Sequence, residues 1–279
     1  MTDDLVTSLA AFVASDLPSR PALRELTAGG GVLLHGSTSF GIRDAFADLD
    51  LWVLATADDV ARFDAASPTR FIEFKWNGRP GHYSVETVGD FAARLSACDL
   101  PLIAELRHAV ALGAAPPDVA ALLSRARLPM PPAVREAWFR YHYVEMRGDH
   151  RALDNPLNRG DATATLLALS STLAHALRAA SVLDAQPYHY SKWLAHRARS
   201  GATGRRVVEL GDELIALLGT DVLRLAVPEA QHPLNLKLKE IRSALTTAAV
   251  SNGFDGDYLH HWWLHLTTTR EGIRTTHWP

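Results

Sequence analysis

Two short polar segments hold the residues whose types and spacing suit metal-dependent chemistry. Gly36-Ser37 is followed, after ten intervening residues, by Asp48-Leu49-Asp50. Successive side chains of a β-strand point to opposite faces, so Asp48 and Asp50 should project together from one side while Leu49 points to a core. Two adjacent carboxylates repel each other unless a cation lies between them, and hard divalent cations prefer oxygen ligands. The pair therefore indicates a metal site.

Gly36 and Ser37 add a means of holding phosphate next to that metal site. Glycine lets the backbone approach a ligand closely, and Ser37 with the amides that follow can bind phosphate oxygens. A phosphate-binding turn beside a carboxylate pair indicates Mg²⁺-dependent phosphoryl or nucleotidyl transfer. The alternative interpretation is a surface Asp-x-Asp at the start of a strand.

The surrounding sequence predicts a small mixed α/β region that positions these residues. Apolar runs predict strands over 32–34 and 48–55, separated by a helix or turn over 39–46. Asn77-Gly78 is a hairpin signal, and it joins predicted strands over 71–76 and 82–88. Predicted helices cover residues 4–15, a short segment up to 26, 58–66, 90–112 and 117–127.

The segment LPMPP, residues 128–132, is the predicted boundary between two domains, because three prolines in five residues cannot continue a helix. Strand signals disappear beyond it. Helical periodicity is found over 133–148, 161–183, 190–199, 206–219, 234–249 and 257–273. We therefore predict an α+β chain, with a mixed-sheet domain over 1–128 followed by an all-α domain over 129–279.

Composition narrows the class of protein. The 279 residues are 47% hydrophobic and 21% charged, which is enough apolar sequence for a core and excludes a disordered chain. The net charge of −3 gives no global attraction to nucleic acid, and the single cysteine, Cys98, excludes an intramolecular disulfide. The N-terminus lacks the basic start of a signal peptide, and no run reaches 18 uninterrupted apolar residues. These features predict a cytoplasmic protein without a membrane span.

The segment LLHGSTSFGIRDAFADLDLWV, residues 33–53, resembles the signature of the polymerase-β-like nucleotidyltransferase superfamily. The likeness is to its minimal branch and to its streptomycin/spectinomycin-type adenylyltransferases. Members join a mixed-sheet catalytic domain to a helical substrate domain. The resemblance implies that Gly36 and Ser37 contact the nucleotide phosphates, and that Asp48 and Asp50 bind two Mg²⁺ ions.

A third carboxylate on a later strand completes the metal site in that family. Glu86 in HYSVETV is the favoured match, since Val85 precedes it, although Thr87 replaces a strong hydrophobe. Glu73 in RFIEFKW is the competitor, on the partner strand of the same predicted hairpin. Hairpin register decides between them, and the sequence leaves open Glu86, Glu73 or neither.

A second, looser resemblance lies in the helical half. Residues 166–198 are similar to a stretch of those adenylyltransferases in which a lysine at a helix start meets the nucleotide triphosphate. The matching residue is Lys192. A lysine there is unfavourable against the helix dipole, so an anionic partner would account for it. A solvated surface lysine is the alternative.

Together these resemblances imply an enzyme that uses Mg²⁺ and ATP. It would transfer AMP to a hydroxyl of a small molecule, such as an aminoglycoside-like antibiotic held between the domains, and release pyrophosphate. Transfer to tRNA or to a protein side chain is a less favoured alternative. A catalytically silent nucleotide-binding protein of the same fold is another.

Overall fold

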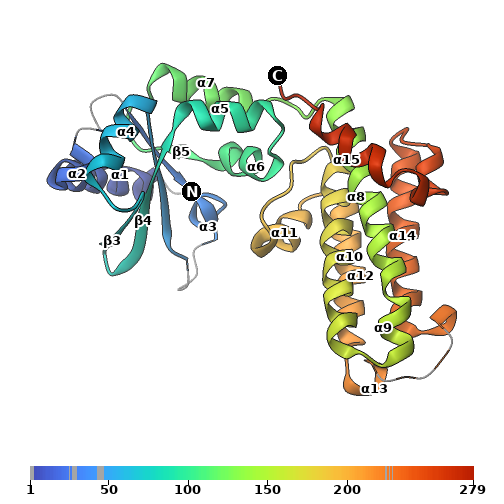
Figure 1. The fold of residues 1–279 in the computed structure, drawn as a ribbon. Coiled ribbons are helices and arrows are strands. Elements are labelled where there is room, and N and C mark those ends of the chain that lie inside the picture. The colour runs from blue at the N-terminus through green and yellow to red at the C-terminus, as the bar shows by residue number, and fades with distance from the viewer. Residues whose placement is uncertain are drawn as a thin grey trace. The chain divides into compact units, whose positions relative to one another are not determined.

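The structure is a computed structural model that describes residues 3–24, 26, 30–42, 47–223, 225, 227 and 229–279. The chain forms two compact units, one of Met1–Leu128 with Pro279 and one of Pro129–Trp278 (Figure 1). The first unit contains a mixed sheet and helices, whereas the described part of the second is helical throughout. The fold class is therefore α+β.

The sheet has five strands in the order β3-β4-β2-β1-β5. Their bounds are β1 Gly31–His35, β2 Leu49–Ala55, β3 Phe71–Trp76, β4 Arg79–Thr87 and β5 Val110–Ala111. The β2–β4 pair is parallel and the other pairs are antiparallel. Asn77 and Gly78 both have positive φ angles, of 49° and 79°, which is the geometry a tight β3–β4 turn requires.

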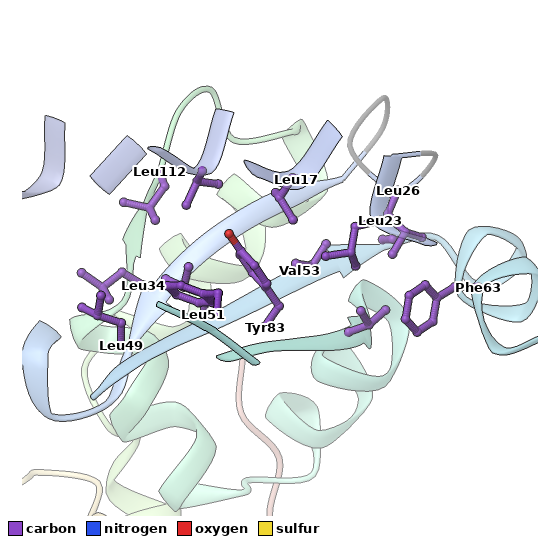
Figure 2. Packing of buried hydrophobic residues seen from close by; sticks show 14 of the residues in the cluster. Leu17, Leu23, Leu26, Leu34, Leu49, Leu51, Val53, Phe63, Tyr83 and Leu112 are labelled. Carbon is purple, nitrogen blue, oxygen red and sulfur yellow. The ribbon is translucent and has the colours of Figure 1, made fainter. Parts of the chain in front are cut away.

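One face of this sheet carries the main core of the first unit. Alternate β2 side chains Leu49, Leu51 and Val53 pack with residues of three helices (Figure 2). Those helices are α1 Asp3–Ser19, α2 Pro21–Arg24 and α4 Ala57–Ala66. On the opposite face the Trp52 ring meets Phe91 of α5 (Val88–Ser96) at 4.9 Å between centroids. Because Asp50 and Trp52 alternate with the core residues, they share this second face.

The predicted helix over 90–112 is interrupted. Cys98 has a φ of 57°, which ends α5, and the Asp99 side chain accepts a hydrogen bond of 3.1 Å from Leu102 N at the start of the next helix. That helix is α6 Leu100–His108, and it leads into β5 and then α7 Pro117–Ala126. Of the segment 39–46, predicted as a helix or turn, Ser39 ends the short helix α3 (Gly36–Ser39), residues 40 and 41 form a turn, and residues 43–46 lie outside the described part of the chain.

In the second unit the helix α10 packs against the helices α8, α9, α11, α12 and α14. By length and composition alone α10 could cross a membrane, because an 18-residue window of it has a mean hydropathy of 1.4, and 44% of that window is buried. Residues 257–273, predicted as one helix, form two short 3₁₀ turns before α15, and Asp257 accepts hydrogen bonds from His261 and His265 there. The helices of the unit are α8 Pro132–Ala152, α9 Asp154–Arg159, α10 Ala162–Leu183, α11 Ser191–Ala198, α12 Ala202–Ala216, α13 Thr220–Leu223, α14 Pro233–Ser251 and α15 Leu266–Arg274.

Candidate metal site

A row of four polar residues crosses the sheet of the first unit from strand to strand. His35 of β1 pairs with Asp50 of β2, Asp50 pairs with His82 of β4, and His82 pairs with Glu73 of β3. Directly paired residues of neighbouring strands project from the same face. The row therefore brings two histidines and two carboxylates, from positions 35 to 82, to one line on the sheet.

Two residues of this row, Asp50 and His82, form a candidate metal site together with Asp48. Ligand atoms of Asp48, Asp50 and His82 all lie within 4.8 Å of one another. Asp48 immediately precedes β2, so it shares a face with Asp50 as strand alternation predicts. His82 Nδ1 is 3.3 Å from Asp50 Oδ1. Two carboxylates and an imidazole at these separations could hold a divalent cation.

Gly36 closes one side of the site. It has a φ of 70°, and a Cβ built on it would overlap the Asp50 carboxylate, 3.0 Å from its Cγ. A side chain at this position would therefore compete with Asp50 for space, in a conformation that L-residues adopt at a cost. The Gly36 amide donates a 3.1 Å hydrogen bond to Glu105 Oε2, and Glu105 is buried. That bond fixes the turn after β1 against α6.

Ser37 and Thr38 follow Gly36 in the buried short helix α3. Thr38 Oγ1 donates a 2.9 Å hydrogen bond to the carbonyl oxygen of Asp48, which ties α3 to the start of β2. Ser37 is buried, and its carbonyl oxygen accepts from the amides of Phe40 and Ile42. The structure thus brings Gly36, Ser37 and the aspartate pair together, as their spacing suggested.

The structure does not bring Glu86 to this site. Glu86 pairs with Leu54, four residues further along β4 than His82, which is about 13 Å at the rise of a strand. Burial raises its pKa, and the nearby charges of Arg70 and Arg94 oppose that shift. The parallel register of β2 and β4 is the reason, because it aligns His82 rather than Glu86 with Asp50.

Glu73, the competing carboxylate, lies in the row beside His82. It also lines a pocket of about 440 Å³ together with Asp48, His82, Phe71 and Lys75. Phe71 is 49% exposed, and its ring stacks on that of His82 with centroids 4.1 Å apart. Of the two acidic residues weighed from the sequence, Glu73 is therefore the one next to the candidate metal ligands.

Lys192 is in the first turn of α11 in the second unit, where it is exposed. Its ammonium lies 5.7 Å from the centroid of the Trp193 ring. Lys192 therefore lies at the start of a helix, as the sequence predicted. Contact of Lys192 with a nucleotide stays a prediction.

Two residues of the site were not identified from the sequence. His82 was missed because a histidine in a strand is a candidate ligand only if the strand pairing brings it next to Asp50. That pairing is set by the β2–β4 register, which depends on the path of the chain through α4. Glu105 was missed because it is an ordinary acidic residue in an amphipathic helix. The one available signal was the Asn77-Gly78 turn, which by itself pairs Glu73 with His82.

Comparisons with known proteins give little beyond this geometry. No family model matches the sequence, and no curated protein matches it significantly. Among solved structures, the chain is similar to a nucleotidyltransferase-like protein from Exiguobacterium sibiricum, with 13% identity and a TM-score of 0.46. That likeness covers 88% of this chain and 76% of the other. At this distance the likeness does not assign a family or an activity.

Proposed function

We propose that this chain is a divalent-metal-dependent nucleotidyltransferase. It transfers a nucleoside monophosphate, AMP from ATP, to a hydroxyl group of a small molecule and releases pyrophosphate. The observation that carries this proposal is the pair Asp48 and Asp50, held at the start of β2 against the Gly36-Ser37 turn and within ligand distance of His82.

The donor set fits a divalent cation. Asp48 and Asp50 bring two negative charges, and the three ligand atoms lie close enough to share one ion. A second ion, as in two-metal transfer, would draw its remaining ligands from the nucleotide phosphates and water. The bound divalent metal would neutralise phosphate charge and lower the barrier to attack at the α-phosphorus.

The protein residues then bind and orient the two substrates. Ser37 and the backbone amides of the turn after β1 hold a phosphate oxygen in this proposal. The pocket beside the metal ligands offers an exposed aromatic ring, Phe71, and a carboxylate, Glu73, to a hydroxylated acceptor such as an aminoglycoside-like antibiotic. Glu73 could accept the proton of the attacking hydroxyl. Lys192 supplies a cation for the β- and γ-phosphates.

The test is incubation of the wild-type protein with each α-³²P-labelled nucleoside triphosphate, Mg²⁺ or Mn²⁺, and a panel of acceptors. The panel contains aminoglycosides, lincosamides, bulk tRNA and protein, and pyrophosphate release and label transfer are both measured. A labelled small molecule, lost with EDTA and in Asp50→Asn, supports the proposal. Label found on tRNA or protein would show that the acceptor is a macromolecule and not a small molecule. Nucleotide binding without pyrophosphate release would favour a silent binding protein.

A further inference from the structure

The ligand set at the candidate metal site differs chemically from a set of carboxylates. His82 occupies the β4 position directly paired with Asp50, so the third ligand group is an imidazole. Glu86, the acidic residue of the same strand, pairs with Leu54 instead. The strand register therefore places a nitrogen donor where an oxygen donor was expected from the sequence.

The ring of His82 is held with one nitrogen toward the aspartates. Nδ1 is the atom 3.3 Å from Asp50 Oδ1, and one ring face lies on Phe71 at an interplanar angle of 27°. The imidazole is 19% exposed and the Asp50 side chain 10%. A ring fixed by stacking and partly removed from water loses little freedom when it coordinates an ion.

Ligand chemistry then determines which ions the site prefers. Mg²⁺ binds oxygen almost exclusively and in strict octahedral geometry, whereas imidazole binds first-row transition metals well. Replacing a third carboxylate by a neutral imidazole also changes the total ligand charge from −3 to −2. This weakens the binding of a hard cation such as Mg²⁺ more than that of a transition-metal dication. Both effects act against Mg²⁺.

We propose that His82 makes this site select a first-row transition-metal dication over Mg²⁺. The inference rests on the proposed function for the assignment of Asp48 and Asp50 as ligands, and it specifies which metal that activity uses. His82 is a metal ligand in this account, and Phe71 is a positioning residue that holds the imidazole plane.

The test compares metal affinities rather than activity. Metal-free protein is titrated at pH 7.5 with CoCl₂ and with MgCl₂ by calorimetry, in wild type, His82→Asp, Asp50→Asn and the exposed control His260→Asp. An aspartate oxygen at position 82 takes nearly the place of Nδ1, so His82→Asp exchanges the donor atom with little change in reach. Co²⁺ binds many sites more tightly than Mg²⁺, and the diagnostic quantity is therefore the change in the Co²⁺/Mg²⁺ affinity ratio on substitution.

We expect His82→Asp to shift that ratio toward Mg²⁺ by at least about tenfold, while His260→Asp leaves it unchanged. Asp50→Asn should weaken both ions. X-ray absorption of the Co²⁺-loaded wild type should show imidazole scattering, which tests the ligand without any variant. An unchanged ratio in His82→Asp, with both metals still lost in Asp50→Asn, would overturn this inference and leave the proposed function standing. Failure of the wild type to bind either ion would overturn both.

Discussion

The substitution Gly36→Ala probes the site through its backbone instead of its ligands. Gly36 has a φ of 70°, a conformation that costs a non-glycine residue about 1–2 kcal/mol. The added methyl group would also overlap the Asp50 carboxylate, which is the end of a side chain and would be displaced from its position in the site. The strand is hydrogen-bonded on both sides, so the Asp50 side chain is the part able to move. We expect a lower unfolding temperature and divalent-metal affinity reduced at least about tenfold.

Gly78→Ala is the matched control. Gly78 has a φ of 79° in the β3–β4 turn, and nothing lies within 4 Å of a Cβ built there, so the backbone strain is similar and the overlap is absent. Scanning calorimetry should show both variants destabilised, and metal titration should show Gly78→Ala binding like wild type. Wild-type metal affinity in Gly36→Ala, or an equal loss in the two variants, would refute the idea that the glycine makes room for Asp50.

Three further predictions concern other parts of the chain. Glu105→Leu leaves the Gly36 amide without its acceptor and should cost about 1–3 kcal/mol by chemical unfolding, with a smaller loss in Glu105→Gln; equal losses would contradict this. Lys192→Ala should weaken ATP binding by about 1.5–3 kcal/mol in calorimetry, with partial recovery in Lys192→Arg, and unchanged affinity would make it a surface lysine. Burial lowers the pKa values of His142 and His175 below 6.5, so the unfolded chain binds more protons and the free energy of unfolding should fall as pH drops below about 6.5; a pH-independent stability, or no reduction of the effect in His142→Gln, would contradict this.

Local patterns in the sequence were sufficient for the elements that depend on neighbouring residues. The alternation of Asp48 and Asp50 with Leu49 and Leu51 predicted a strand with one core face, and the structure has that strand with Leu49 and Leu51 in the main core. The Asn77-Gly78 turn predicted the β3–β4 hairpin in the same way. The alternation and the turn each depend on residues that are close in the sequence, and at that range the backbone preferences of the residues determine the structure.

The third ligand could not be predicted by the same means. The choice between Glu86, Glu73 and His82 depends on the parallel pairing of β2 with β4, which are separated by α4 and β3. Glu86, which follows Val85, has the expected strand pattern whether or not it lies close to Asp48 and Asp50. The break at Cys98 was missed for a related reason, because helical periodicity continues across it.

The most direct test of the central claim is nucleotidyl transfer by Asp48→Asn and Asp50→Asn, measured beside their thermal unfolding. Asn keeps the size and shape of the Asp side chain, and the variants lose a repulsion between two carboxylates, so the fold should stay intact. The account predicts that both variants unfold near the wild-type temperature and that pyrophosphate release is abolished in each. Wild-type turnover in either variant would contradict it, and so would a large loss of stability, since the carboxylates would then serve the fold rather than a metal.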